Sequence, residues 1–344
     1  METENSLPRH ILFIRNSAMG DVAMLPHAVR ALKSAYPDVK VSIATRELFK
    51  PFFRGLDVDF IFLDTKGAHR GISGIFNFVR EIHKRGVDAI ADTHGVIRSY
   101  QIDLIAKLFG IRSVSIDKGK IEKWFRLGYS KPDAKPLKHS VVRYCDVVRR
   151  FGFEFDNPTP ITEKPAYANP MGEKRGVWVG FAPFSAHTGK TYPADMCEEL
   201  VRLLSERCER LFIHSGGGEE LRFAEEMERK YENVTAVFPL LRLEKEIDLI
   251  ANLDCMVSMD SMAMHLSSLV ATPVVSIWGA THPEFGFLGY GCSDDCVLQV
   301  ELPCRPCSIY GKKECKYGDY RCLRAITPQM VADKVSEVIA PLSE

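Results

Sequence analysis

The sequence lacks any long hydrophobic run. No stretch of its 344 residues approaches the ~18–20 consecutive apolar residues that a membrane-spanning helix requires. The first six residues are acidic and polar, whereas a secretory signal begins with basic residues followed by an apolar core. We therefore expect a cytoplasmic protein.

An excess of charge of one sign is also absent, because 45 Lys and Arg balance 45 Asp and Glu. Nucleic-acid-binding domains are usually basic overall, so we expect no nucleic-acid partner. The charge is nevertheless uneven: residues 106–150 carry twelve basic and four acidic side chains, and residues 195–250 carry fourteen acidic and eight basic ones. The basic segment is either a solvated helical surface or a surface that meets lipid phosphates.

Cysteine is not scarce, and ten thiols in a reducing compartment are not expected to form structural disulfides. Four are scattered along the chain and are expected to be small buried apolar residues: Cys145, Cys197, Cys208 and Cys255. The other six lie within residues 292–322. Among these, Cys304, Cys307, Cys315 and Cys322 are spaced so that they either hold a zinc ion or remain free thiols, and only one C-x-x-C pair is present.

Short apolar runs alternate with helical patterns along the chain, which indicates parallel sheets covered by helices on both faces. The strands expected in the first half are residues 11–14, 39–44, 60–63, 89–91 and 114–116. Those expected in the second half are residues 177–181, 211–214, 235–237, 255–259 and 274–278. Helical periodicity is clear at 22–35, 196–208, 219–231 and 244–253.

A proline-rich polar stretch at residues 156–176 separates the two series and reads as a linker. We expect an α/β protein with two Rossmann-like parallel-sheet domains, at 1–160 and 176–326, and a C-terminal helix at 327–344. Parallel sheets bind ligands at the carboxyl ends of their strands, so the two domains are expected to face a central cleft.

The first expected strand runs into a loop that ends at Gly20 and Asp21, followed by an apolar helix. The loop has one glycine where the dinucleotide fingerprint G-x-G-x-x-G has three, which argues against NAD or FAD binding. Two interpretations of Asp21 remain open. It is either the N-cap of the helix or a general base at the edge of the sheet.

A corresponding junction follows the strand at 255–259, where Asp260 and Ser261 precede an expected helix and His265 lies about one and a half turns further on. Free N–H groups at a helix start bind phosphate, and His265 would add a donor. The alternative is that Asp260 caps the helix and His265 fills a polar gap.

Two further loops follow strands of the second series. Lys190 lies in a loop of small residues, where it is placed to neutralise a diphosphate, but Phe184 replaces the first glycine of a P-loop. Three glycines at 216–218 allow close approach of a ligand, and Glu219 behind them either accepts ribose hydroxyls or simply suits a helix start.

Taken together, these segments resemble glycosyltransferase family nine, the bacterial ADP-heptose:lipopolysaccharide heptosyltransferases. The resemblance rests on residues 11–22 with 30–33, on the Asp-Thr-His-Gly-Val-Ile-Arg-Ser run at 92–99, and on 260–265 continuing into 272–275 and 279–283. It implies a GT-B fold, with an acceptor-binding N-terminal domain and a nucleotide-sugar-binding C-terminal domain.

The resemblance also implies roles for single residues. Asp21 matches the catalytic base of an inverting, metal-independent transfer that needs no cofactor. Lys190 matches the lysine that steadies the diphosphate, and Ser185 a hydroxyl residue beside it. The donor site is further matched by Glu219 (with Glu220 as a second possible register), Asp260, Ser261, Met262 and His265. Met262 departs from the glycine usual at its position, so the match defines the donor as a nucleotide-sugar and does not define which sugar it carries.

Arg98 is the residue we expect at the acceptor site, because it follows the strand end at 89–91. The function implied is transfer of heptose, or a related sugar, from an ADP-sugar to a phosphorylated lipopolysaccharide core acceptor. Such an enzyme is expected to be peripheral on the inner face of the inner membrane. Two alternatives are a GT-B nucleotide-sugar epimerase, and a non-catalytic nucleotide- or metal-binding module.

Overall fold

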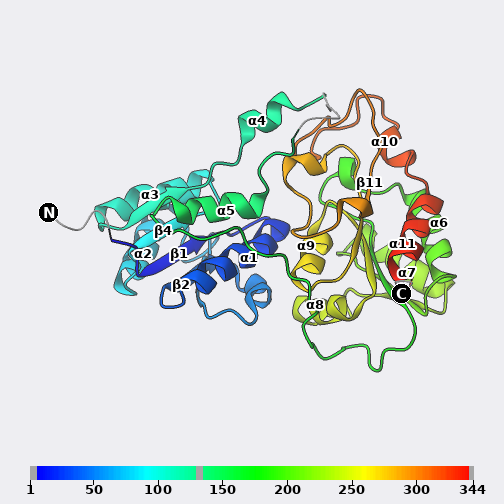
Figure 1. Cartoon of the computed structure of the whole chain (residues 1–344), viewed down its shortest axis with the longest axis horizontal. Coiled ribbons are helices and arrows are strands. Elements are labelled where there is room, and N and C mark those ends of the chain that lie inside the picture. Colours follow the sequence, from blue (N-terminus) through cyan, green and yellow to red (C-terminus); the bar gives the residue numbers. More distant parts are fainter. Residues whose placement is uncertain (1–5, 129–134, 341–344) are drawn as a thin grey trace. The chain divides into compact units, whose positions relative to one another are not determined.

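The computed structural model describes residues 6–128 and 135–340 and divides the chain into two compact units (Figure 1). Unit 1 comprises Met1–Lys120 and Lys138–Thr159, and unit 2 comprises Ile121–Leu137 and Pro160–Glu344. The acidic start of the chain, part of the basic segment and the end of the expected C-terminal helix lie outside the described residues. Within the described ranges, no helix is both long and apolar enough to cross a membrane.

Unit 1 contains a five-stranded parallel sheet in the order β3-β2-β1-β4-β5. Its strands are β1 (His10–Ile14), β2 (Lys40–Thr45), β3 (Asp59–Phe62), β4 (Ala89–Asp92) and β5 (Arg112–Ser115). The helical segments are α1 (Met19–Ala35), η1 (Glu47–Phe53), α2 (Gly71–Lys84), α3 (Ile97–Leu108) and α5 (Ser140–Arg149). Every residue of β1 and β4 is buried, as expected for strands covered on both faces.

Unit 2 contains a six-stranded parallel sheet in the order β8-β7-β6-β9-β10-β11. Its strands are β6 (Trp178–Ala182), β7 (Arg210–Ile213), β8 (Val234–Ala236), β9 (Cys255–Met259), β10 (Val274–Ile277) and β11 (Val297–Leu298). The helices are α4 (Lys120–Phe125), α6 (Ala194–Ser205), α7 (Glu219–Lys230), α8 (Leu243–Asn252), α9 (Met262–Leu269), α10 (Arg321–Arg324) and α11 (Pro328–Ile339). Short 3-10 turns are η2 (Thr188–Lys190), η3 (Pro283–Phe285) and η4 (Asp294–Cys296).

The prediction of an α/β chain with two parallel-sheet domains is confirmed, and ten of the strands lie within about two residues of their expected positions. Strand β11 was not predicted, because two residues carry no periodicity. Residues 121–137 group with unit 2, whereas the sequence led us to expect one continuous domain over 1–160. Helix α11 packs against α6 and the sheet strand β9.

The strand order reverses between β1 and β4 in unit 1 and between β6 and β9 in unit 2. Open parallel sheets bind ligands outside the carboxyl ends of the strands at such a switch point. The segments that follow these four strands, including the first turn of α1 and the short turn η2, carry Asp21, His94, Lys190 and Asp260. The topology of each unit therefore directs its polar residues to the edge where a ligand is expected.

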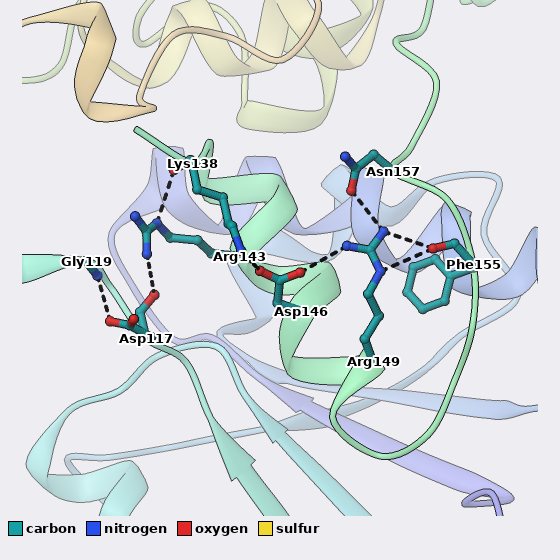
Figure 2. A network of polar contacts seen from close by, with 8 residues as sticks. All are labelled: Asp117, Gly119, Lys138, Arg143, Asp146, Arg149, Phe155 and Asn157. Atoms are coloured by element: carbon teal, nitrogen blue, oxygen red, sulfur yellow. Dashed lines mark hydrogen bonds and ion pairs between the residues drawn. The ribbon is translucent and has the colours of Figure 1, made fainter. Parts of the chain in front are cut away.

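Helix α5 hydrogen-bonds to segments of unit 1 that lie close in sequence to its three boundaries with unit 2 (Figure 2). The Arg143 guanidinium donates to the carbonyls of Asp117 (3.2 Å) and Lys138 (3.1 Å), which lie at the exit and the re-entry of the chain. The Arg149 guanidinium donates to the carbonyl of Phe155 (2.9 Å), close to the final exit.

Lys138 and Asp146 together link the two arginines in the same network (Figure 2). Asp146 accepts from Lys138 Nζ at 2.5 Å and pairs with Arg149 at 3.0 Å. Burial opposes ionisation of this carboxyl, but its hydrogen bonds from the two cations keep the pKa of Asp146 below its ordinary value. Through these contacts, α5 holds Asp117, Lys138 and Phe155 in position within unit 1.

Candidate functional site

Asp21 lies in the first turn of α1 and not at its N-cap, which is Ala18. The N-cap interpretation of Asp21 is therefore wrong by three positions. The carboxylate still satisfies a free donor at the helix start, because its Oδ2 accepts from the backbone N–H of Ala18 at 3.2 Å. About a third of the side chain is exposed, so the carboxylate is reachable from solvent.

A buried arginine holds the Asp21 carboxylate. Arg15, at the end of β1, forms an ion pair with Asp21 and donates to the carbonyl of Thr93. The Arg15 guanidinium also lies 5.7 Å from the centre of the Tyr144 ring, and the Tyr144 hydroxyl donates to the Asp21 carbonyl at 3.2 Å. Three segments of unit 1 thereby fix the position of one carboxylate.

His94 and Lys118 complete the charged group around Asp21. Burial and the nearby cations Arg15 and Lys118 lower the pKa of His94 to about 4, so its imidazole is neutral at physiological pH. Its Nε2 lies 3.2 Å from Ser17 Oγ. Burial, together with Arg15, also lowers the pKa of Lys118, whereas Asp21 acts in the opposite direction.

A pocket of about 230 Å³ opens at the same edge of the sheet, entirely within unit 1. Its polar lining comes from Asn16, Thr65, His94, Arg98 and Ser99, and its apolar lining from Ile14, Leu63, Val96 and Ile102. The sequence placed Arg98 at the end of a strand, whereas the structure places it in the first turn of α3. Its guanidinium donates to the carbonyl of His69 at 2.7 Å. The residue nonetheless lines the pocket, which makes it available to an anionic ligand.

Two buried carboxyl groups lie beneath this region. Asp92 accepts the backbone N–H groups of His94 and Gly95, both at 2.9 Å, and so shapes the turn that presents His94. Asp103 on α3 accepts from Ser115 Oγ at 2.7 Å. Burial, reinforced by Asp92, raises the pKa of Asp103 to about 7, so this carboxyl is partly protonated near neutral pH.

In unit 2, Lys190 and Asp260 meet at the switch point of the sheet. Lys190 Nζ lies 2.9 Å from Asp260 Oδ2, and Thr281 Oγ1 donates to the same oxygen at 3.0 Å. Both charged side chains are largely buried. Asp260 precedes the N-cap of α9, which is Ser261, so the interpretation of Asp260 as the helix cap is wrong.

The start of α9 leaves backbone donors next to this pair. The Ser261 hydroxyl lies 3.2 Å from Ser258 Oγ and makes no capping hydrogen bond to the first turn. The first N–H groups of a helix have no partner within it, so those at the start of α9, where Met262 lies, are suited to an anion. His265 is buried on the next turn, and Ser185 lies half-buried beside the Lys190 turn, where its N–H faces Thr191 Oγ1 at 3.3 Å.

The glycine loop after β7 distinguishes the two glutamates that follow it. Glu219 is 93% exposed and pairs with Arg222 on the next turn of α7, at 3.3 Å. Glu220 turns back, and its carboxylate accepts from the backbone N–H of Gly216 at 2.7 Å. Of the two registers, the geometry therefore favours Glu220 as the acid that faces the loop.

Residues of the cysteine-rich segment at 292–322 pack against the Lys190 site. Arg305 is 2% exposed, and its guanidinium donates to the carbonyls of Gly279 (2.6 Å) and Thr281 (3.1 Å). Gly311 packs so closely on the Lys190 side chain that a methyl group at that position would overlap it. This segment therefore fixes both the lysine and the threonine that contact Asp260.

The four cysteines proposed as zinc ligands line one small cavity of about 30 Å³: Cys304, Cys307, Cys315 and Cys322. Across residues 6–128 and 135–340, however, no three ligand-type side chains converge closely enough to hold a metal ion. Of the scattered cysteines, three are buried as expected and Cys208 is partly exposed. Burial raises the pKa of Cys145 and of Cys255 to about 12, which makes both thiols unreactive.

The two Rossmann-like sheets and their switch-point sites place the chain in the GT-B fold class of glycosyltransferases. The sequence matches the family model described as glycosyltransferase family 9 (heptosyltransferase) over residues 75–319. Because this match covers more than half of the chain, the chain belongs to glycosyltransferase family 9.

Solved structures of similar fold include the E. coli ADP-heptose LPS heptosyltransferase II, with a TM-score of 0.70 at 17% identity over 96% of this chain and 98% of that one. E. coli heptosyltransferase WaaC with ADP gives 0.66 at 18% identity, over 96% and 99%. A curated relative, lipopolysaccharide heptosyltransferase 1 of Pseudomonas aeruginosa, is 26% identical over 164 residues. That match spans 44% of this chain and 44% of the relative's length.

Sequence reasoning assigned no role to several residues of these sites, notably Arg15, His94, Thr281 and Arg305. Arg15 and His94 lie inside segments that carry the family resemblance, so their place in those segments could have marked them as site residues. Arg305 follows no periodic pattern, and only the fold shows that its side chain is buried.

Proposed function

We propose that the chain is an inverting glycosyltransferase that transfers heptose from an ADP-sugar to a phosphorylated lipopolysaccharide core acceptor. The observation that carries this proposal is the buried Lys190–Asp260–Thr281 group at the switch point of unit 2, beside the start of α9, where Ser261 makes no capping hydrogen bond. Membership of glycosyltransferase family 9 supports the reaction class, and the similarity of the fold to that of WaaC with ADP supports the nucleotide.

Unit 2 binds the donor in this proposal. Lys190 and the amino terminus of α9, with Ser261 and Met262, neutralise the diphosphate, and His265 and Ser185 add donors. Asp260 orients Lys190 in the free enzyme and accepts hydrogen bonds from hydroxyl groups of the donor sugar. Glu220, rather than the exposed Glu219, accepts the ribose hydroxyls at the glycine loop.

Unit 1 activates the acceptor. The Asp21 carboxylate removes the proton from the acceptor hydroxyl as its oxygen bonds to the anomeric carbon and the bond to the diphosphate breaks. Arg15 fixes the carboxylate, while neutral His94 and the Lys118 ammonium line the approach. The pocket beside Asp21 receives the acceptor, and Arg98 pairs with its phosphate or carboxylate group.

Calorimetry with ADP and UDP tests the donor assignment most cheaply. The proposal predicts that ADP binds at least about tenfold more tightly than UDP, a difference of roughly 1.4 kcal/mol. Preference for UDP would support the nucleotide-sugar epimerase, and binding of neither nucleotide would support a non-catalytic module. Transfer is then tested with ADP-heptose and a core acceptor, using mass detection of the glycosylated product.

A further inference from the structure

Helix α3 in unit 1 exposes four of its large apolar side chains and buries two of its polar ones. Its outer face carries Ile97, Tyr100, Leu104 and Leu108, which are 79%, 49%, 67% and 80% exposed. The face turned to the sheet buries Ser99 and Asp103 beside Ile102. A helix on the surface of a soluble domain normally has the opposite arrangement.

These four residues recur at three- and four-residue intervals and so form one continuous stripe along the helix, hereafter the α3 stripe. At its C-terminal end the stripe is extended by α2, where the Phe76 ring, 43% exposed, lies 5.5 Å from the Phe109 ring. Single exposed apolar residues are ordinary on a protein surface, whereas a continuous row of this length indicates a binding surface.

A basic groove adjoins the same end of the α3 stripe. It has a volume of about 370 Å³, and its charged lining residues are Lys107, Arg112 and Arg150, with no acidic lining residue among those described. Arg112 and Arg150 hydrogen-bond to uncharged backbone carbonyls, those of Ser6 and Ser115. Lys107 lies on the exposed side of α3 itself and connects the groove to the apolar row.

We propose that the α3 stripe and the basic groove are a docking surface for an anionic lipid bilayer. The helix lies in the plane of the membrane, with its apolar residues at the boundary between headgroups and acyl chains. The phosphates of anionic lipids meet Lys107, Arg112 and Arg150. The apolar stripe and the basic lining of the groove lie side by side, which matches the layered order of acyl chains and anionic headgroups at a bilayer surface.

The docking surface leads directly to the pocket of unit 1. The N-cap Val96 and the first turns of α3, with Arg98, Ser99 and Ile102, line the pocket, while the outer side of the same helix carries the stripe. A lipid-linked acceptor would therefore keep its acyl chains in the bilayer while its sugar enters the pocket. This choice of membrane rests on the proposed function, but binding to vesicles is a separate property of the surface.

Co-sedimentation of the full chain with vesicles tests the inference. One set of vesicles contains equal amounts of phosphatidylglycerol and phosphatidylcholine, and the other contains phosphatidylcholine alone. We expect binding to the anionic vesicles, weakened steeply by salt, and about tenfold weaker binding after replacement of Leu104→Ser with Leu108→Ser. Lys107→Glu is expected to weaken binding about fivefold.

The matched controls are exposed residues of unit 2. Leu240→Ser replaces a leucine that is 60% exposed, and Arg175→Gln replaces a guanidinium whose side chain is 79% exposed. Both variants should bind like the unmodified chain. The replaced α3 leucines are exposed and lie outside the proposed active site, so folding, checked by circular dichroism, should be unaffected.

Equal binding by the α3 variants and the unmodified chain would overturn the inference, and so would absence of binding to anionic vesicles. A dimer in sedimentation equilibrium that the two leucine replacements dissociate would also overturn it, because a second copy of the chain would then cover the stripe. Transfer to a soluble acceptor fragment is measured in parallel. If the unmodified chain transfers heptose to this fragment but does not bind anionic vesicles, the docking surface alone is refuted. If it binds the vesicles but transfers nothing, the proposed function alone is refuted.

Discussion

The Lys190 ammonium lies 2.9 Å from the Asp260 carboxylate, and both side chains are largely buried. A buried ion pair of this kind is costly to break from one side, because the remaining charge loses its partner in a poorly solvated place. A diphosphate would approach a lysine that is already fixed in position. The energetic cost of ordering the lysine is therefore met before the donor binds.

Lys190→Met is expected to lower kcat/KM for the ADP-sugar by about 100-fold, which corresponds to roughly 2.7 kcal/mol of lost stabilisation. The measurement is the rate of ADP release at several donor concentrations. Lys245→Gln, a lysine on α8 that pairs with Asp248, is the matched control and should change the rate little. An unchanged kcat/KM in the Lys190 variant would remove the lysine from the donor site.

Replacement of the two neighbouring glutamates should have unequal effects. Glu219→Gln should change the Kd for ADP less than about twofold, because the side chain is almost fully exposed and pairs only weakly within its helix. Glu220→Gln should raise that Kd about tenfold through loss of a carboxylate acceptor at the loop. Calorimetry with ADP measures both, and the reverse order would restore Glu219 as the ribose ligand.

Asp103 should give unit 1 a stability that depends on pH. Its pKa is about 7 in the folded protein and 3.8 ordinarily, so between these values the folded state binds the extra proton. This contribution to stability is present in full at low pH and is lost as pH rises towards 7, at about 1.4 kcal/mol per pH unit. The free energy of unfolding of the unmodified chain, minus that of Asp103→Asn, should therefore fall from pH 4 to pH 7.

Urea titrations at four pH values measure this difference. Asp38→Asn, at an exposed position, is the control and should give a difference that stays flat over the same range. A flat difference for Asp103→Asn as well would mean that this carboxyl is ionised in the folded protein throughout.

Gly119 should be sensitive to substitution because of Arg143. Its φ is +60°, and a methyl group there would overlap the Arg143 guanidinium (Figure 2). Gly86 has a φ of +77° with open space around it, so Gly86→Ala carries only the backbone strain, about 1–2 kcal/mol. Gly119→Ala should destabilise the chain by about 1–2 kcal/mol more than Gly86→Ala in urea unfolding. Equal destabilisation would show that Arg143 moves aside without cost.

The fold could be predicted because each buried parallel strand corresponds to a short apolar run in the sequence, and segments with helical periodicity separate these runs. Burial of Val22, Leu25, Val29 and Leu32 along one face of α1 follows directly from their spacing. Helix α3 was not predicted, since four of its large apolar residues are exposed and its buried face carries Asp103 beside Ile102. The spacing of apolar residues alone does not tell which face of such a helix is buried.

The candidate sites could be predicted to the level of loops and not to that of hydrogen bonds. Asp21 and Asp260 both fall near helix starts, yet one lies inside the first turn and the other before the N-cap. A shift of one residue likewise decides between Glu219 and Glu220, because successive helical residues point about 100° apart. Contacts such as Arg305 with the Thr281 carbonyl join segments about 24 residues apart, and no local pattern encodes them.

The role of Asp21 as the base of a heptosyl transfer is tested by transfer from ADP-heptose to a core acceptor, with mass detection of the product. We expect product formation by the unmodified chain and by Asp38→Asn. We expect a loss of at least about 1,000-fold in kcat for Asp21→Asn, with the Kd for ADP unchanged. Turnover by Asp21→Asn equal to that of the unmodified chain would show that Asp21 is not the base and would leave it the structural role of holding the start of α1.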